Sequence, residues 1–379
     1  MRLSVCFIVR NEAEHLERAL KSVCGLADEI VVADTGSADS SRDVARAAGA
    51  QVVEFPWIDD FAAARNFSIA HATGDWILWL DADEELFAGD QELVRQAMRE
   101  PRALGWLVQR LDLHTLAPRE SGTWMRQLRL FRRDPALRFR GRCHPTFHPS
   151  LEEIAAARGQ QLGDSRIRLR HYGYLGGPSV AKQERACRLL RLELQDRPGQ
   201  IYYEVELGRT LLLTGNPEGR QWLRTAAARL KACLADPQPP SVVAAMLLEY
   251  LLLTAPAVAG CPISPVEAQA AAEKWYPQAA PLLWARAQLR YQASDFGEAR
   301  RLLERLLNLA QTEGVDRWIS FNPRLLGDDL RLNLAACCLR LTDLDAAETH
   351  LRAIPPDSPQ AGAAQKNLAV IADIRRQLP

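Results

Sequence analysis

Two different hydrophobic periods divide this chain, and they restrict its fold more than any other feature. In the first hundred residues, short apolar runs such as Leu3–Val9 and Trp76–Leu80 alternate with segments whose apolar residues recur at helical spacing. Strands that alternate with helices in this way are typical of a parallel, doubly wound sheet. From Val180 onward, leucine and alanine recur at helical spacing throughout. The sequence therefore predicts an α/β domain followed by an all-α domain.

The α/β part has recognisable strands and helices. Strands are expected at 3–9, 29–33, 51–54 and 76–80, and helices at about 12–23, 39–48 and 60–70. Asp39 or Ser37 is expected to cap the second helix. Between about 104 and 175, β-type segments at 106–113, 123–132 and 166–170 are separated by turns and prolines. We expect a small mixed extension of the sheet there.

The helical part begins after Gly176-Gly177-Pro178, so the expected domains are residues 1–178 and 179–379. Within it, the segments 285–307 and 333–351 resemble each other. Each predicts a helix, a tight turn with aspartate, and a second helix with a small residue at the crossing. A looser unit covers 202–227. Such units are like the tetratricopeptide (TPR) helix–turn–helix, although they are spaced more widely than the roughly 34 residues of a regular array. We expect an irregular helical-repeat domain.

Composition and charge restrict the class of protein. The chain has 47 basic and 47 acidic residues, so a general attraction to nucleic acid is not indicated. No apolar stretch reaches the roughly 20 residues of a membrane-spanning helix, and the first apolar run is too short for a secretion signal. The eight cysteines show no zinc-type spacing. These features predict a cytoplasmic protein, at most peripheral at the inner membrane, without a nucleic-acid partner.

An acidic turn follows the fourth predicted strand, which ends in Asp81-Ala82-Asp83. Ligands of parallel α/β sheets bind at the carboxyl ends of the strands. Mg²⁺ at such sites takes one or two protein carboxylates and completes its shell with substrate phosphates. The turn therefore predicts a metal–diphosphate site for Mn²⁺ or Mg²⁺. Its structural alternative is a solvated loop or a helix N-cap, since a lone Asp-x-Asp is a weak motif.

Polar residues also accompany the other predicted strands. They are Arg10-Asn11-Glu12 after the first strand, Asp34-Thr35-Gly36-Ser37 with Asp39 after the second, and Arg65-Asn66 on the helix before the fourth. One edge of the sheet would therefore gather acids, an arginine and backbone N–H groups, which suits a nucleotide diphosphate with its metal. Each segment alone has a structural explanation as a turn, a cap or a solvated charge. Together they favour a binding site.

The four segments together resemble the family 2 glycosyltransferases. The residues that carry the resemblance are Arg10-Asn11-Glu12, Asp34-Thr35-Gly36-Ser37 with Asp39, Arg65-Asn66-Phe67 and Leu80-Asp81-Ala82-Asp83-Glu84. The resemblance covers residues 1 to about 100, and continues more loosely through Arg129–Arg132, His144 and His171–Tyr174. It implies a nucleotide-diphospho-sugar transferase fold of the GT-A type. The most similar branch is bacterial, carries a C-terminal TPR-like region, and includes lipopolysaccharide-core sugar transferases and peptide S-glycosyltransferases.

The resemblance also implies roles for the nucleotide-binding residues. Asp34 would contact the nucleobase, and the loop Arg10-Asn11-Glu12 would line the base and ribose pocket. Arg65 and its neighbour Asn66 would help to hold the nucleotide.

The resemblance implies a metal site as well. Asp83 would be the principal metal ligand, and Asp81 would lie near the ribose and the metal. His171 would touch the metal or the diphosphate. Its structural alternative is a histidine at a strand end that hydrogen-bonds a backbone carbonyl.

The implied reaction is a single, usually inverting displacement, in which a general base removes the proton of the acceptor. The related branch usually has His-Glu where this chain has His144-Pro145, so the expected glutamate is missing. His144, His148, Glu152 or Glu153 could act as the base instead. Alternatively, the acceptor is a thiol, which needs less help because it ionises readily.

Seven arginines between Arg126 and Arg142 form a local basic cluster. They could engage an anionic acceptor or the diphosphate of the donor. A solvated strand face, with arginines pointing alternately outward, is the alternative.

Three functions compete on these observations. The first is a hexosyl- or related transferase that uses a nucleotide-diphospho-sugar, with UDP-sugar favoured, and a glycan, lipid-linked glycan or peptide acceptor. Its helical domain would dock the acceptor or a protein partner. The second is a catalytically impaired nucleotide-sugar-binding protein that acts as a helical-repeat scaffold, which Pro145 favours. The third, a nucleotidyltransferase, needs a glycine-rich loop after the first strand, and Ile8–Glu12 has no glycine.

Overall fold

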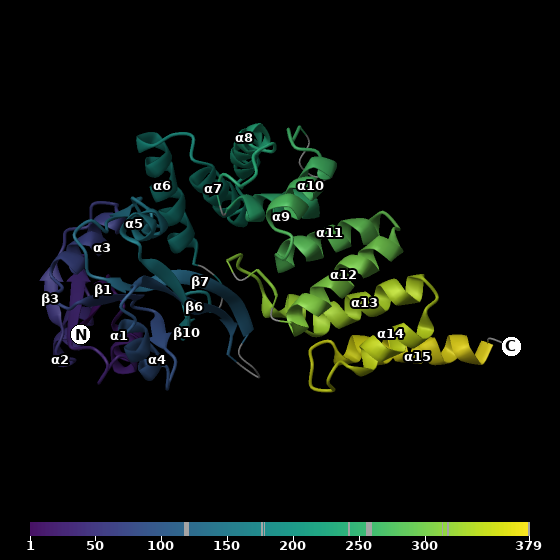
Figure 1. Cartoon of the computed structure of the whole chain (residues 1–379), viewed down its shortest axis with the longest axis horizontal. Helices are drawn as coiled ribbons and strands as arrows, with labels where there is room; N and C mark the ends of the chain where they lie inside the picture. Colours follow the sequence, from purple (N-terminus) through teal and green to yellow (C-terminus); the bar gives the residue numbers. More distant parts are fainter. Residues whose placement is uncertain are drawn as a thin grey trace. The chain divides into compact units, whose positions relative to one another are not determined.

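The computed structural model describes residues 1–379 except 117–120, 176, 178, 242, 255–259, 313, 317, 378 and 379. The chain divides into two compact units, Met1–Gly199 and Gln200–Pro379. The first unit contains the sheet and its helices, and the second is built from helices (Figure 1). The predicted succession of an α/β domain and an all-α domain is therefore confirmed.

The division lies after Gly199, whereas the sequence pattern places the change between residues 178 and 179. Helix α6 (Val180–Asp196) belongs to the first unit. Its Glu193 carboxylate accepts a hydrogen bond from the backbone N–H of Arg142 at 2.7 Å, and its Asp196 accepts one from the Arg142 guanidinium at 2.6 Å. Of the expected linker, Gly176 and Pro178 lie outside the described residues. A helical period alone does not tell which unit a helix packs on.

Within the described residues, an eight-stranded mixed sheet has the order β3-β2-β1-β4-β7-β6-β10-β5. Its strands are β1 (Leu3–Val9), β2 (Glu29–Asp34), β3 (Gln51–Glu54), β4 (Trp76–Asp81), β5 (Glu84–Leu86), β6 (Ala103–Thr115), β7 (Ser121–Arg132) and β10 (Gln161–His171). Strands β3, β2, β1 and β4 run parallel, and β7 joins β4 antiparallel. Strand β10 pairs parallel with β6 and antiparallel with β5. The expected mixed extension is confirmed, whereas the short strands β5, β8 (Phe139–Arg140) and β9 (Thr146–Phe147) were not predicted.

Helices cover both faces of the sheet (Figure 1). They are α1 (Ala13–Ser22), α2 (Ser41–Ala47), α3 (Phe61–Ala70), α4 (Gln91–Met98) and α5 (Leu151–Arg158). Along β1, Val5 and Phe7 belong to the core that includes residues of α1 and α4, whereas Cys6 belongs to the core that includes residues of α3 and α5. This alternation follows from the period of two in a strand. A sheet buried on both faces leaves its strand ends as the place for a polar site.

Helix α2 begins at Ser41, two residues after the expected start at Asp39. Its N-cap is Ser40, without a side-chain capping hydrogen bond. The Asp39 carboxylate instead accepts hydrogen bonds from the backbone N–H groups of Ser41 at 3.0 Å and Ala13 at 3.1 Å. The predicted cap at Asp39 or Ser37 is therefore wrong. Asp39 connects the starts of α1 and α2.

The second unit contains α7 (Ile201–Leu213), α8 (Gly219–Ala232), α9 (Ala244–Thr254), α10 (Pro265–Trp275), α11 (Ala280–Gln292), α12 (Phe296–Gln311), the 3₁₀ turn η1 (Pro323–Leu326), α13 (Asp328–Arg340), α14 (Leu344–Arg352) and α15 (Ala361–Gln377). No helix in the described part of the chain is long and apolar enough to cross a membrane.

Two helix pairs of this unit share the same turn. Ser294 and Thr342, with φ of 62° and 60°, occupy the left-handed region before α12 and α14. Asp295 then caps α12, accepting from the Glu298 N–H at 3.2 Å, and Asp343 caps α14 in the same way. The buried alanines Ala299 and Ala347 follow on the second helix of each pair. The expected TPR-like units are therefore present, and α7 with α8 forms the looser third one.

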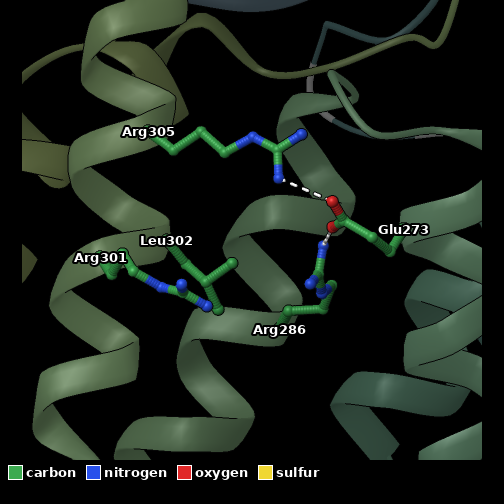
Figure 2. Close-up of a pocket in the computed structure, with 5 residues that line it drawn as sticks. All are labelled: Glu273, Arg286, Arg301, Leu302 and Arg305. Carbon is green, nitrogen blue, oxygen red and sulfur yellow. Dashed lines mark hydrogen bonds and ion pairs between the residues drawn. The ribbon is translucent and has the colours of Figure 1, made fainter.

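A cavity of about 400 Å³ lies among α10, α11 and α12, and three arginines line it (Figure 2). Glu273 of α10 forms ion pairs with Arg286 of α11 and, at 2.8 Å, with Arg305 of α12. Burial raises the pKa of Glu273, but hydrogen bonds from Arg305 and Arg286 outweigh it and hold this pKa below its usual range. Arg301 pairs with Glu298 of its own helix at 2.7 Å. The ionised Glu273 therefore connects three helices.

Candidate functional site

The predicted polar segments meet at the carboxyl edge of the parallel strands. In the register of the sheet, Val9 of β1 lies opposite Asp34 of β2, and Ile8 lies opposite Asp81 of β4. The loop that begins with the exposed Arg10 follows β1 directly. The two predicted aspartates therefore flank the end of β1.

The loop after β1 and the loop after β2 hold each other. Asn11 adopts a positive φ of 54°, which lets its side-chain oxygen accept a hydrogen bond from the Ala38 N–H at 2.7 Å. Its own N–H donates to the Ser37 hydroxyl at 3.0 Å. Glu12 donates its N–H to the Ser41 hydroxyl at 2.9 Å. Asn11 and Glu12 are thus placed at the predicted site, with Asn11 shaping the loop.

Asp34 has one satisfied and one unsatisfied carboxylate oxygen. Its Oδ1 accepts hydrogen bonds from the N–H groups of Gly36 at 3.2 Å and Ser37 at 3.0 Å. Its Oδ2 is buried and has no hydrogen-bond partner among the residues that the structure describes. A buried acceptor without a donor is costly. A ligand that brings an N–H group to this oxygen would remove that cost.

Two arginines hold the Asp81 carboxylate. Arg65 Nη2 lies 3.1 Å from Asp81 Oδ1, and Arg129 Nη2 lies 3.6 Å from its Oδ2. Both guanidinium carbons lie over the Trp79 indole, at 3.6 and 3.4 Å from the ring centroid. Burial raises the pKa of Asp81, but Arg65 and Arg129 outweigh it and hold this pKa well below its usual range. Asp81 is therefore ionised and neutralised by protein cations.

Arg129 and Glu84 form a buried ion pair next to Asp81, which the sequence did not indicate. Glu84 accepts a hydrogen bond from Arg129 Nη2 at 2.5 Å and another from the Asp81 N–H at 2.9 Å. Arg110 Nη1 lies 3.5 Å from the same carboxylate. Burial lowers the pKa of Arg129 to about 10, although Glu84 and Asp81 oppose this change. These charges fix the backbone of the acidic turn.

His171 lies between two carboxylates. Its Nδ1 is 2.6 Å from Asp112 Oδ1, and its Nε2 is 3.4 Å from Asp83 Oδ2. Burial lowers the pKa of His171, but the hydrogen bonds with Asp112 and Asp83 outweigh it and raise this pKa to about 9. The alternative of a histidine satisfied by a backbone carbonyl is therefore wrong. Asp112 orients the ring so that Nε2 faces Asp83.

Gly173 keeps the space beside Asp83 and His171 open. A Cβ atom at this position would lie 2.5 Å from Asp83 Oδ2 and 2.7 Å from His171 Nε2. Only a residue without a side chain leaves these two atoms accessible.

The donor set at this place suits a divalent cation that shares its shell with a phosphate ligand. No group of three or more His, Cys, Asp or Glu side chains in the described residues is placed to hold a metal. Two protein ligands are enough for Mg²⁺ or Mn²⁺ when substrate phosphates supply the others. A carboxylate on the far nitrogen of a histidine, as Asp112 is here, is the usual support of a metal-binding imidazole.

Other predicted site residues have different contacts. Both polar atoms of the Asn66 side chain bind the backbone of Phe139, at 2.8 and 2.9 Å, so Asn66 holds strand β8. Glu153 forms a capping box with Ser150 at the start of α5. Glu152 is exposed on the same helix, and His144 is exposed in the loop between β8 and β9. The identity of the base stays a prediction.

Three arginines of the basic cluster are buried or donate hydrogen bonds to backbone carbonyl groups of the protein. Arg129 is fully buried, Arg132 Nε donates to the Ala103 carbonyl at 2.8 Å, and Arg133 Nε donates to the Gly74 carbonyl at 2.7 Å. The interpretation of the cluster as a solvated strand face is wrong for the buried Arg129 and the half-buried Arg132, whereas Arg133 is exposed. Their guanidinium groups instead support the sheet and the acidic turn.

Residues 4–149 match the family model Glycosyl transferase family 2. This segment is a family 2 glycosyl transferase domain. The match includes β1 to β4 with Asp34, Asp81 and Asp83. Helix α5, strand β10 with His171 and helix α6 follow the matched segment in the chain.

Known relatives share parts of the chain. A TPR repeat-containing protein of Synechococcus elongatus is 37% identical over 261 residues, which are 66% of this chain and 61% of that protein. An uncharacterized glycosyltransferase of Rickettsia bellii is 34% identical over 116 residues, which are 30% of this chain and 39% of the relative. The chain therefore spans less than two thirds of the length of either curated relative.

Among solved structures, glucosyl-3-phosphoglycerate synthase from Mycobacterium tuberculosis, in complex with Mn²⁺, UDP and glucosyl-3-phosphoglycerate, is 26% identical. The match has a TM-score of 0.25 and covers 29% of this chain and 44% of that chain.

Proposed function

We propose that this chain transfers a sugar from a nucleotide-diphospho-sugar, with a UDP-sugar favoured, to an acceptor in a metal-dependent single displacement. The observation that carries the proposal is the pair of Asp83 and His171, which Gly173 leaves open at the carboxyl edge of the parallel strands. The family of residues 4–149 supplies the reaction class.

The nucleobase would bind at Asp34. Uracil has an imide N–H between two carbonyl groups, and the unsatisfied Oδ2 of Asp34 is an acceptor for such a donor. The neighbouring loop of Arg10, Asn11 and Glu12 would line the base and the ribose. The hydrogen bonds of Asn11 fix the shape of this loop before the donor binds.

Asp83 and His171 would hold the divalent cation, Mn²⁺ or Mg²⁺, and Asp81 would lie beside it. When bound, the cation neutralises charge that builds on the departing diphosphate. Asp112 would keep the His171 ring in place through Nδ1. Arg65 and Arg129 would keep the Asp81 carboxylate ionised and oriented toward the site.

In the proposed reaction, an acceptor atom attacks the anomeric carbon while the bond to the diphosphate oxygen breaks. The proton of the acceptor would pass to a general base, for which His144, Glu152 and Glu153 are the candidates. Glu152 is favoured over Glu153 as the general base, because the Glu153 side chain forms the capping box of α5 with Ser150. A thiol acceptor would need the least assistance.

The acceptor would be a glycan, a lipid-linked glycan or a peptide, and the helical unit would dock it or a protein partner. Helical-repeat proteins commonly bind partners on their extended surfaces, and the TPR repeat-containing relative supports a repeat architecture for this unit. A cytoplasmic location, with or without peripheral attachment at the inner membrane, stays a prediction of the sequence.

A second candidate is a nucleotide-sugar-binding protein without turnover, because Pro145 occupies the position of the expected glutamate. Both candidates bind the donor, and only the first releases UDP in an acceptor-dependent manner.

The proposal is tested by thermal-shift measurements across nucleotide-sugars with different bases and sugars, each with Mn²⁺ and with EDTA. We expect stabilisation by a uridine donor that EDTA abolishes. A folded sample that no nucleotide-sugar stabilises would refute the proposal.

A further inference from the structure

A lysine ammonium group lies beside the carboxylate assigned to the metal. Lys182 Nζ is 3.8 Å from Asp83 Oδ2, the same oxygen that faces His171 Nε2. Lys182 is in the first turn of α6, where its backbone N–H donates to the Ser179 hydroxyl at 3.2 Å. Its side chain is 45% exposed. The ammonium group is therefore anchored by its helix and still reachable by a ligand.

This helix is fixed to the transferase unit by its other turns. Leu189 and Leu190 are fully buried, Arg188 pairs with Asp59, and Glu193 binds the backbone of Arg142. The position of Lys182 beside Asp83 is thus a consequence of how α6 docks.

Asp83 and Glu12 are acidic groups near Lys182 in the described part of the chain. Burial raises the pKa of Glu12, Asp83 raises it further, and Lys182 lowers it, so Glu12 lies within the electrostatic range of both groups. Arg185, one turn further along α6, also lowers this pKa. Lys182 and His171 therefore both face the same Asp83 carboxylate oxygen.

A divalent cation bound to Asp83 would add a second positive charge beside the Lys182 ammonium group. The Lys182 ammonium group, which lies 3.8 Å from Asp83 Oδ2, and a cation bound to that carboxylate would repel each other unless an anion lies between them. The diphosphate of the donor is the anion that the proposed reaction brings to this place. It can bind the cation through one oxygen and accept a hydrogen bond from an ammonium group through another.

We propose that Lys182 binds the diphosphate of the donor opposite the metal and stabilises it as it leaves. This inference rests on the proposed function. When the bond between the anomeric carbon and the diphosphate oxygen breaks, its electron pair stays on that oxygen. The Lys182 ammonium group donates a hydrogen bond to the diphosphate and keeps its proton. Lys182 lies on helix α6, which follows the residues that match the family model.

The proposal requires opposite effects on two ligands. Removal of the ammonium charge relieves the repulsion with the cation, so Mn²⁺ alone should bind more tightly. It also removes a charge-assisted hydrogen bond to the diphosphate, so UDP should bind more weakly when Mn²⁺ is present. A side chain that only supports the fold would weaken both.

Calorimetric titration of the full chain tests this expectation. Mn²⁺ alone, and then UDP at saturating Mn²⁺, are titrated into wild type, Lys182→Gln, Lys182→Arg and the control Lys21→Gln, whose lysine pairs with Glu17 on the surface of α1. We expect Lys182→Gln to bind Mn²⁺ about threefold more tightly and UDP about tenfold more weakly. Lys182→Arg should retain UDP binding, and Lys21→Gln should match the wild type.

Three results would overturn the inference. If Lys182→Gln bound both ligands like the wild type, Lys182 would have no role in binding the diphosphate. The proposed donor site would be unaffected by that result. Lys182→Gln that loses both ligands would assign Lys182 a structural role. Wild-type protein that binds neither ligand would overturn the proposed function itself, and the inference with it.

Discussion

His171 Nε2 and Asp83 Oδ2 lie 3.4 Å apart, and they join the end of β10 to the turn after β4. Asp83 directly precedes β5, and β5 pairs with β10 so that Glu84 lies opposite His171. It brings together a residue of the family 2 transferase segment and a residue that follows it. Gly173 leaves the space next to both atoms open. We propose that this pair receives the metal of a nucleotide-sugar donor.

The first prediction concerns Gly173. Gly173→Ala places a methyl group within 3 Å of Asp83 Oδ2 and His171 Nε2, the two atoms proposed to bind the metal, so UDP binding in Mn²⁺ should weaken at least about tenfold, which corresponds to about 1.4 kcal/mol. Calorimetry measures the loss, and circular dichroism checks the fold. Gly297→Ala is the matched control, because no atom lies within 4 Å of its Cβ position and alanine favours its helix. Unchanged UDP binding by Gly173→Ala would contradict the assignment.

The second prediction concerns the nucleobase. Asp34→Asn preserves an oxygen for the N–H groups of Gly36 and Ser37, but replaces the unsatisfied oxygen by an NH₂ donor. UDP should then bind roughly 10–100-fold more weakly, since a hydrogen bond to a charged group is worth about 1.5–3 kcal/mol. The loss should be smaller for CDP, whose base presents an acceptor at the same place. Competition of the two nucleotides in Mn²⁺ measures this change, and an equal loss for both would count against base recognition by Asp34.

The third prediction concerns the buried pair of Arg129 and Glu84. Arg129→Met leaves Glu84 buried without its closest cation, so the free energy of unfolding should fall by about 3–5 kcal/mol. The double variant with Glu84→Gln should recover part of this loss. Urea denaturation of the full chain measures both. Arg99→Ala, at an exposed pair with Glu92, should change stability by less than about 1 kcal/mol. A double variant no more stable than Arg129→Met would show that lost packing dominates.

The fourth prediction concerns pH. Burial lowers the pKa of His350 in α14, and Arg331 lowers it further. Because the folded pKa lies below the unfolded value of about 6.5, the unfolded chain binds a proton first on acidification. The helical unit should therefore be destabilised as the pH falls below about 6.5. Denaturation at neutral and mildly acidic pH should show a smaller loss in His350→Gln than in the wild type. The same pH dependence in both proteins would refute the prediction.

The place of the candidate site could be predicted from the sequence because it depends on local order. Asp34 and Asp81 follow apolar strands, and the carboxyl ends of parallel strands meet at one edge whatever the details of packing. His171 was indicated by its resemblance to a family position. Asp34 and Asp81 need only the order of the parallel strands to come together, whereas His171 reaches them through the pairing of β10 with β5.

The supporting residues depend on pairings that a local pattern does not contain. Asp112 reaches His171 because β6 lies beside β10 in a register that pairs these two residues. Glu84 and Arg129 contact each other because β7 pairs with β4 in the sheet. Lys182 reaches Asp83 because α6 packs on the transferase unit, whereas its helical period placed it with the repeats. Long-range register and docking therefore determine the electrostatics of the site.

The most direct test of the central claim is calorimetric titration of UDP into the wild-type protein and Asp83→Asn, each in Mn²⁺ and in EDTA. The account predicts binding by the wild type in Mn²⁺, at least about tenfold weaker binding in EDTA, and equally weak binding by Asp83→Asn in both conditions. Equal UDP binding by the folded wild-type protein in Mn²⁺ and in EDTA would contradict it.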